Sequence, residues 1–392
     1  MTDSRSAVHL AHEVSPLLQA LMASWAEQAG VRALLIKGEI TNQLRLRPPR
    51  GSLDADLWVS PDSFDAFCAL IATRGWLKVH DSEALGEKIL RPHSATCRHV
   101  AWPAETDVHH YFPGFTAPAQ EVFELLWARR VSYEVAHQTV LGVDRVGAAL
   151  ISALHHLRST TSTGHQSELA YLTDQVAQWP TGELASLADL AAATGATVTA
   201  GAFLDAVGAP VDPEQTSDRD ELARWEENTR GSGLVGFGAL HAIRAAPWRQ
   251  RPRLLWRHLW VSPEILRARD PSVFDDGKPM PVARARVRRL GGRGARLARR
   301  TPRGAAMITI SPQVAWVDRG ESVWLLHLAA EDPTPVELTD SAASLWRLLP
   351  AASVGELAER VGVDFSVPVD AVIADVENYV ASMLDQGFVE VA

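Results

Sequence analysis

The sequence is poor in cysteine and contains no long apolar run. Its 392 residues include two cysteines, Cys68 and Cys97, which excludes a metal cluster built from cysteines and favours a reducing compartment. No apolar run approaches the roughly 20 residues that a membrane-spanning helix needs. The N-terminus also lacks the basic, then apolar, then small-residue succession of a secretory signal peptide. We therefore expect a cytoplasmic protein that has no membrane partner.

Lysine is scarce as well, and acids outnumber basic residues by 47 to 38. The formal net charge is -9 at pH 7, and the lysines are few: Lys37, Lys78, Lys88 and Lys278. A chain of this charge is a poor binder of nucleic acid, so we expect no nucleic-acid partner. The exception is the arginine-rich stretch 284–303, with nine arginines and three glycines, which we interpret as a basic helix end that passes into a linker.

The length predicts more than one domain, because 392 residues exceed a single ordinary core. We predict three segments: an α/β core over 1–130, a helical domain with the arginine-rich linker over 131–303, and a further domain over 304–392. Helical and strand periodicity alternate in the first segment, whereas the second carries helical patterns with little strand signal.

Two acids interrupt what otherwise reads as a buried strand over residues 53–59. Asp54 and Asp56 share one face of that strand with Ser52, and the opposite face is entirely apolar. One interpretation is a pair of surface acids on a half-exposed edge strand. The other is a site: like charges about 6–7 Å apart repel, and a divalent cation relieves that repulsion.

A third acid follows on a later predicted strand, within residues 99–112. Asp107 and His109 share one face of it, so Asp107 could complete a set of three carboxylates with Asp54 and Asp56. Hard oxygen ligands suit Mg²⁺ or Mn²⁺, and such a set is what two-metal phosphoryl or nucleotidyl transfer requires. His109 is either a catalytic or substrate-positioning residue or a structural histidine.

Three residues near the first strand have two interpretations each. Gly38, at a strand-to-helix turn, could let backbone N–H groups approach a phosphate, or it could be purely structural. Lys37 could reach a phosphate or end a strand in solvent. Arg50 could clamp a phosphate bidentately or flank a turn.

The other histidines give no metal signature in the sequence. His155 and His156 are adjacent on a predicted helix and so point about 100° apart, which predicts that they cannot chelate together. We interpret them, with nearby His165, as packing residues. Cys97 and His99 lack the spacing of a zinc site.

Residues 10–300 resemble the nucleotidyltransferase-like family encoded beside enzymes that modify ribosomally made peptides, within the polymerase-β-like superfamily. The resemblance rests on Lys37-Gly38, on R-G-S-x-D-x-D-L-x-V over 50–59, on Gly75-Trp76 and on D-V-H-H over 107–110. It implies that Gly38 and Ser52 face the nucleotide, that Asp54 and Asp56 bind both metals, and that Asp107 completes one metal site. The nucleotide-binding set is thus Lys37, Gly38, Arg50 and Ser52, with an NTP as co-substrate.

The last segment changes to three predicted strands followed by three helices. With the run VELTDSAASLWRLL it resembles the PqqD-like peptide-recognition domain, a winged-helix-like element that captures leader peptides. The resemblance implies that a leader adds as a strand beside the run at 336–338 and fills a groove against the last helix. The implied contacts are Val336, Glu337, Leu338, Val380 and Leu384. The alternative is a DNA-binding winged helix, which the many acids of this segment disfavour.

Together these features predict an α+β protein in which a polymerase-β-like nucleotidyltransferase core and a helical domain are followed by a winged-helix-like PqqD domain. The predicted function is a tailoring enzyme that binds the leader of a ribosomal precursor peptide and transfers a nucleotidyl group from an NTP to its core. Two alternatives stay open: phosphoryl transfer to the peptide, and a non-catalytic adaptor that presents it.

Overall fold

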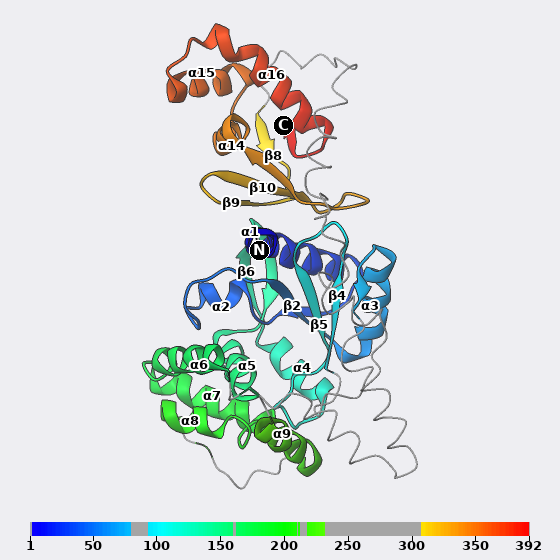
Figure 1. Ribbon diagram of the computed structural model, residues 1–392, viewed down its shortest axis with the longest axis vertical. Coiled ribbons are helices and arrows are strands. Elements are labelled where there is room, and N and C mark those ends of the chain that lie inside the picture. The colour runs from blue at the N-terminus through cyan, green and yellow to red at the C-terminus, as the bar shows by residue number, and fades with distance from the viewer. Residues whose placement is uncertain are drawn as a thin grey trace. The chain divides into compact units, whose positions relative to one another are not determined.

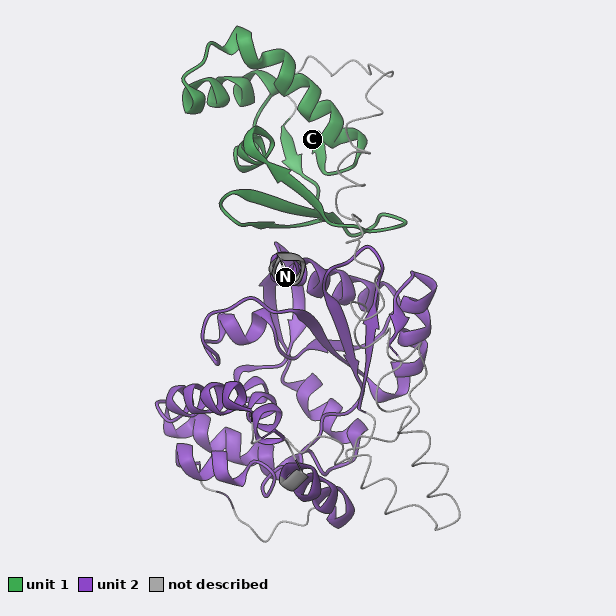
Figure 2. Cartoon of the chain, in the orientation of Figure 1, with its two compact units in different colours: residues 1–6, 274–392 green, residues 7–273 purple. Residues whose placement is uncertain are grey.

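The computed structural model describes residues 2–79, 93–159, 162–209, 211, 218–231 and 307–391. The chain divides into two compact units, residues 7–273 and residues 1–6 with 274–392 (Figure 2). The arginine-rich stretch 284–303 and the predicted boundary at 303/304 lie outside the described residues. No helix within the described ranges is long and apolar enough to cross a bilayer.

The larger unit is built on a seven-stranded mixed sheet in the order β3-β4-β5-β2-β1-β7-β6 (Figure 1). Its strands are β1 (Ala33–Leu35), β2 (Asp54–Val59), β3 (Leu77–Lys78), β4 (Ser94–Arg98), β5 (Glu105–His109), β6 (Val131–Val135) and β7 (Gln138–Gly142). The helices among them are α1 (Thr2–Gln28), α2 (Glu39–Gln43), α3 (Phe64–Thr73) and α4 (Ala119–Ala128), with a 3-10 turn at Pro61–Ser63.

The strand that carries the two acids is central, which contradicts the edge-strand interpretation. β2 pairs antiparallel with β1, where Leu34 faces Trp58, and parallel with β5. Every residue of β2 after Asp54 is buried, so both of its faces are covered. A carboxylate on such a strand is buried, and an unpaired buried charge costs free energy. An acid is therefore expected there only where a partner or a ligand compensates its charge.

The sheet continues past residue 130, where the sequence predicted only helices. The hairpin β6–β7 joins the sheet through β7, which runs parallel to β1 with Leu35 opposite Gly142. Its turn residues, Ala136 and His137, both have positive φ (51° and 59°) without the glycine or asparagine that normally signals such a turn. That missing signal explains why sequence reasoning did not find the hairpin.

The helical part of this unit packs around α5. Its helices are α5 (Arg145–Leu157), α6 (Thr163–Val176), α7 (Thr181–Ala193), α8 (Gly201–Val207) and α9 (Arg219–Gly231). Asp144 caps α5, its carboxylate accepting a hydrogen bond from the Gly147 N–H at 2.8 Å. The side chains of α5 are almost all buried, so the helix forms part of the core.

The C-terminal unit has the predicted strands followed by helices. A three-stranded sheet has the order β11-β10-β9, and β8 pairs with β12 in a second, unpredicted sheet. Its elements are β8 (Ile308–Ile310), β9 (Val314–Asp318), β10 (Ser322–His327), β11 (Val336–Thr339), α14 (Asp340–Arg347), α15 (Val354–Phe365), α16 (Val369–Asp385) and β12 (Val389–Val391).

The two helices α14 and α15 begin differently. At the start of α15 the Ser353 hydroxyl accepts a hydrogen bond from the Glu356 N–H at 3.1 Å, and the Glu356 carboxylate accepts one from the Ala352 N–H. At the start of α14 the Thr339 side chain makes no capping hydrogen bond.

Candidate active site

Two of the three predicted acids face each other across adjacent strands. Asp56 on β2 is the direct partner of Asp107 on β5 in the parallel register. One ligand atom each from Asp56, Asp107 and His109 lies within 4.8 Å of the others. Strand alternation places His109 on the face of Asp107, as the sequence predicts. Asp54 is not in that group, but the charges of Asp56 and Asp107 both act on it, so we call Asp54, Asp56 and Asp107 the carboxylate cluster.

Asp56 is the buried centre of this cluster, with 3% of its surface exposed. Its Oδ1 accepts from Lys37 Nζ at 2.6 Å and lies 2.9 Å from His109 Nε2. Burial alone would raise the pKa of Asp56, but Lys37 and His109 outweigh it and hold that pKa below its usual range. Asp56 is therefore ionised, and Lys37 points at a carboxylate rather than into solvent.

Asp54 is held close to this ionised neighbour. The Ser52 hydroxyl donates to Asp54 Oδ1 at 3.0 Å, and the Ser15 hydroxyl donates to the Asp54 carbonyl at 2.9 Å. The negative charge of Asp56 raises the pKa of Asp54 to about 6, and burial adds to the effect. Repulsion between two carboxylates is thus only partly relieved by the protein itself.

Asp107 contributes a buried carboxylate oxygen to the site, and Arg158 contributes a positive charge. Asp107 Oδ1 is buried and has no hydrogen-bond partner among the described residues. Arg158, at the C-terminal end of α5, has its pKa lowered by burial, while Asp56 and Asp107 favour its charge. Sequence reasoning missed Arg158, because only the packing of α5 brings it to the sheet.

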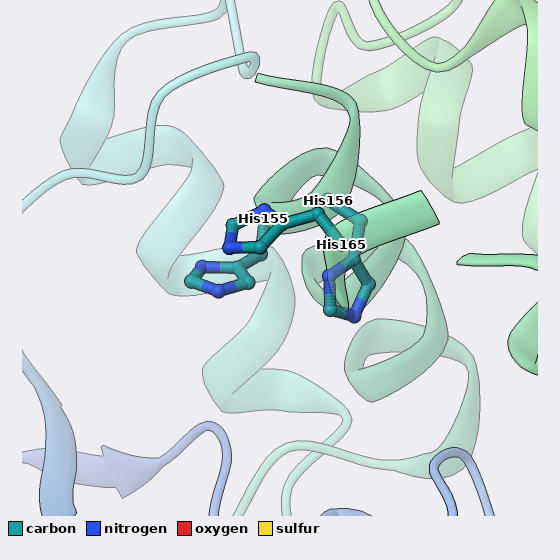
Figure 3. Close-up of side chains that lie close together, drawn as sticks. All are labelled: His155, His156 and His165. Carbon is teal, nitrogen blue, oxygen red and sulfur yellow. The ribbon is translucent and has the colours of Figure 1, made fainter. Parts of the chain in front are cut away.

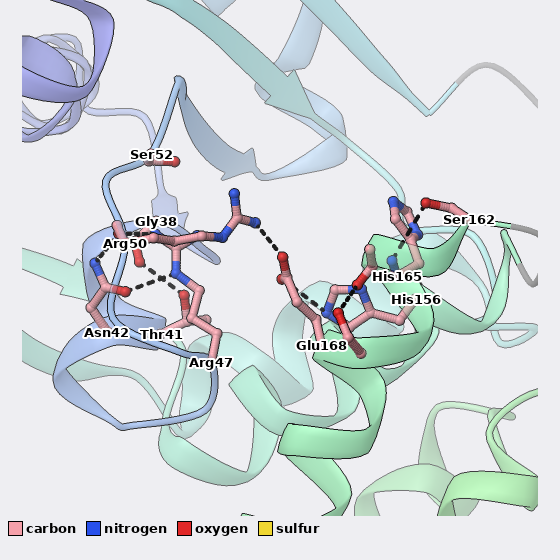
Figure 4. A network of polar contacts seen from close by, with 12 residues as sticks. Gly38, Thr41, Asn42, Arg47, Arg50, Ser52, His156, Ser162, His165 and Glu168 are labelled. Carbon is pink, nitrogen blue, oxygen red and sulfur yellow. Dashed lines mark hydrogen bonds and ion pairs between the residues drawn. The ribbon is translucent and has the colours of Figure 1, made fainter. Parts of the chain in front are cut away.

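Gly38 and Arg50 have structural roles that the sequence does not reveal. Gly38 has φ of 69°, and a Cβ there would lie 2.3 Å from Gln19 Nε2, so the turn requires glycine. Arg50 forms an ion pair with Glu168 at 2.8 Å (Figure 4). A phosphate would have to compete with Glu168 for Arg50, and both nucleotide contacts stay predictions.

The residues predicted to bind a leader peptide gather on one strand and one helix of the smaller unit. β11 pairs with β10, and within the described residues its other edge has no strand partner. Val336 and Glu337 are half-buried and exposed, respectively, whereas Leu338 and Val380 are buried in the core. Leu384 is partly buried against the same core. The backbone of β11, its outer side chains and the partly exposed Leu384 are therefore accessible to a peptide.

The rings of His155 and His156 lie close together although the two residues are adjacent on α5, with centroids 5.1 Å apart. With His165 they form a group in which one ring nitrogen of each lies within 4.8 Å of the others (Figure 3). The start of α6 brings His165 to the end of α5. We call His155, His156 and His165 the histidine triad.

Comparison with known proteins assigns the class of one part of the chain. The molecule is an α+β protein, and residues 326–389 match the family described as "Coenzyme PQQ synthesis protein D (PqqD)". The predicted PqqD-like character of the C-terminal segment is confirmed over this range. None of the curated proteins matches the chain significantly.

Several solved structures are similar to part of the chain. One of them is an antigenic nucleotidyltransferase-like protein from Paracoccidioides brasiliensis, with 13% identity and a TM-score of 0.33, covering 50% of this chain and 93% of that one. A similarity at that level carries no argument, so the N-terminal site is interpreted from its own geometry.

Proposed function

We propose that this protein is a metal-dependent nucleotidyltransferase that modifies a ribosomal precursor peptide held by its C-terminal unit. The observation that carries the proposal is the register of β2 and β5, which sets Asp56 opposite Asp107 in the centre of a buried sheet. Acids occupy core positions of a sheet rarely and at a cost in free energy, unless they bind something.

The residues of the carboxylate cluster fit a divalent cation such as Mg²⁺ or Mn²⁺. Asp107 Oδ1 is a buried oxygen with no partner among the described residues, and Asp54 has a pKa raised to about 6 by its ionised neighbour. Both features are what a cation between carboxylates corrects. Asp54, Asp56 and Asp107 would hold the metal, which would supply activation of an attacking hydroxyl and positive charge against the triphosphate.

The neighbouring side chains prepare this cluster for an anionic substrate. Lys37 and His109 keep Asp56 ionised and fix the direction of its carboxylate. Lys37 and Arg158 are the cations beside the acids, so each can turn to phosphate oxygens when a nucleotide arrives. The Ser52 hydroxyl orients Asp54. These residues position and stabilise charge, which is most of what catalysis of phosphoryl and nucleotidyl transfer needs.

The C-terminal unit would bind the leader of the precursor peptide. A leader segment would add to the free edge of β11, where backbone hydrogen bonds give affinity and the side chains beside Val336 and Leu384 give selectivity. Tethering the leader raises the local concentration of the core peptide at the catalytic unit, so the latter need recognise little of its sequence. The acceptor would be a hydroxyl or carboxylate of the core.

Intact-mass analysis tests the proposal. The full chain is incubated with NTPs, Mg²⁺ and a precursor peptide encoded beside its gene, and the peptide should gain one nucleotidyl unit. A gain of a phosphoryl unit would instead assign a kinase. No gain of either, while the leader still binds, would reject transfer.

The adaptor alternative is tested in the reconstituted pathway. Asp54→Asn and Asp56→Asn should abolish the modification although the leader still binds, because only the proposed enzyme needs the acids. An adaptor would support the pathway unimpaired in Asp54→Asn, whose fold should not be weakened. Loss of modification in Asp56→Asn counts against an adaptor only where circular dichroism shows that this variant is folded.

A further inference from the structure

The histidine triad joins the end of α5 to the start of α6 (Figure 3). The ring centroids are 5.1 Å apart for His155 and His156, 5.1 Å for His155 and His165, and 5.4 Å for His156 and His165. His156 is buried, and the other two rings are partly buried. The proposed transfer reaction does not use any of the three.

These spacings are those of imidazoles around one metal ion. A zinc–nitrogen bond is about 2.0–2.1 Å long, which puts each ring centroid about 3.2 Å from the metal and tetrahedral neighbours roughly 5 Å from one another. The three observed separations, 5.1, 5.1 and 5.4 Å, agree with that value. Ring rotations are then sufficient to bring the three nitrogens into contact with one ion.

The rings also carry nitrogens that nothing in the described protein satisfies. Nδ1 of His155, of His156 and of His165 is buried, and none of the three has a hydrogen-bond partner among the described residues. Leaving such atoms unpaired costs free energy, so a cluster of three calls for an explanation. Burial lowers the pKa of all three rings and keeps them neutral, which is the form that binds a metal.

The Glu168 carboxylate, on α6, lies next to the histidine triad. Glu168 Oε2 lies 3.6 Å from His156 Nε2, and Glu168 Oε1 accepts from Arg50 at 2.8 Å (Figure 4). At 3.6 Å the two atoms do not form a hydrogen bond, but a small movement of either side chain would make one. A carboxylate hydrogen-bonded to the outer nitrogen of a ligating histidine fixes the tautomer and strengthens the ligand. Ser162 caps α6 by accepting from the backbone N–H of His165 at 3.4 Å, which fixes the start of the helix that carries the third ring.

The surrounding charges decide between a cation and an anion as the ligand. Lys37, Arg50 and Arg158 act on the triad, but Lys37 is paired with Asp56 and Arg50 with Glu168, and Arg158 faces Asp56 and Asp107. An anion would need protonated imidazoles, which burial opposes. A metal needs neutral ones, and these are present.

We propose that the histidine triad binds a divalent transition metal of the Zn²⁺ class, separate from the carboxylate cluster. His155, His156 and His165 supply the three ligands, and Glu168 orients His156. Imidazole donors favour such a metal over Mg²⁺, which prefers oxygen. The bound metal would clip α5 to α6 and so brace the helix end that carries Arg158.

Cobalt spectroscopy tests this assignment directly. The full chain is stripped of metal and titrated with Co²⁺, whose tetrahedral complexes absorb strongly in the visible range. About one equivalent should give that band, since three imidazoles and a water make one tetrahedral site. His165→Asn should abolish the band. Asp107→Asn should retain it because that change alters only the carboxylate cluster.

Two further variants guard against a folding artefact. His137→Asn is the matched control, because His137 is an exposed histidine with φ of 59°, a conformation that asparagine tolerates. It should leave the Co²⁺ band unchanged. Glu168→Gln keeps the size of the side chain and should weaken Zn²⁺ binding about tenfold or more. The rise in Tm on adding Zn²⁺ should shrink accordingly.

Three results would overturn the proposal. The first is a wild-type protein without the tetrahedral band, and the second is a band that survives His165→Asn or disappears in Asp107→Asn. The third is binding of inorganic triphosphate that His165→Asn abolishes while the wild type binds no Co²⁺. That last result would assign an anion pocket to the same residues.

Discussion

The carboxylate cluster and the histidine triad belong to the same compact unit but are stabilised in opposite ways. In the first, ionised Asp56 is held by the charge of Lys37 and by a contact to His109, and its neighbour Asp54 carries a raised pKa. In the second, burial keeps three rings neutral and a single carboxylate lies beyond them. The carboxylate cluster is therefore destabilised by repulsion between negative charges. The histidine triad is destabilised by ring nitrogens that have no hydrogen-bond partner among the described residues.

This contrast predicts different chemistry and different responses to pH. A cluster of acids selects hard cations and substrates that carry phosphate, whereas neutral imidazoles select borderline transition metals. Protonation weakens the repulsion in the first cluster but charges the buried rings of the second. Four substitutions, taken from the largest expected effect to the smallest, can break or sharpen the comparison.

The largest effect is expected from Asp107→Asn on peptide modification. The change removes a metal ligand while keeping the size of a side chain whose Oδ1 makes no hydrogen bond within the described residues. We expect transfer to fall by about 10²–10³-fold, the loss typical of removing one electrostatic contact to a transition state. Quenched-flow labelling with radioactive NTP measures it.

The matched control is Asp189→Asn, on the exposed side of α7. It should leave the labelling rate unchanged. Equal labelling rates in the wild type and Asp107→Asn would show that Asp107 is not needed for transfer. That result would contradict metal-dependent transfer by the carboxylate cluster.

Asp56→Asn should destabilise the fold. It strips the buried partner from Lys37 and weakens the contact to His109, and breaking a buried ion pair costs about 3–5 kcal/mol. Urea unfolding at pH 7 in EDTA measures the change. In a double-mutant cycle with Lys37→Gln the two costs should be far from additive, and simple additivity would show that the pair is not coupled.

Asp54→Asn should stabilise the metal-free protein. The folded pKa of about 6 lies above the unfolded value, so the folded state binds more protons between about pH 4 and 6 and the wild type loses stability as pH rises through that window. The variant avoids this loss and should gain about 2 kcal/mol in free energy of unfolding at pH 7 but little at pH 4. A gain that is independent of pH would contradict the charge argument.

His156→Gln should respond to pH in the opposite direction. Burial lowers the pKa of His156 to about 3, so the unfolded state binds more protons below about pH 6.5 and the wild type loses stability as pH falls. When the pH is lowered from 7 to 5, the free energy of unfolding of the wild type should fall by about 1–2 kcal/mol more than that of the variant. Both are measured in EDTA. Parallel pH profiles for the two proteins would mean that His156 titrates normally in the fold.

Sequence patterns reached the carboxylate cluster because strand alternation is local. Period-two spacing placed Asp54 and Asp56 on one face of their strand, and Asp107 and His109 on one face of theirs. The parallel pairing of β2 and β5 then brings Asp56, Asp107 and His109 together. The direction of Lys37 was left open, since whether a strand end meets solvent or a carboxylate depends on tertiary packing.

The histidine triad could not be predicted in the same way. The helical angle between His155 and His156 argues against a shared ligand, and that rule ignores side-chain torsions and the arrival of α6. The hairpin β6–β7 was missed for a different reason, because its turn at Ala136 and His137 lacks the glycine or asparagine that signals such a turn. The triad arises from contacts between segments, whereas the hairpin is local but carries no local signal.

Binding of Mn²⁺, followed by electron paramagnetic resonance, tests the central claim most directly. The metal-free full chain is titrated at pH 7 with ATP present, alongside Asp107→Asn and His165→Asn. The wild type and His165→Asn should bind Mn²⁺ alike, and Asp107→Asn at least about tenfold more weakly, since it lacks one carboxylate ligand. Equal Mn²⁺ binding by the wild type and Asp107→Asn would contradict a metal site built from these acids.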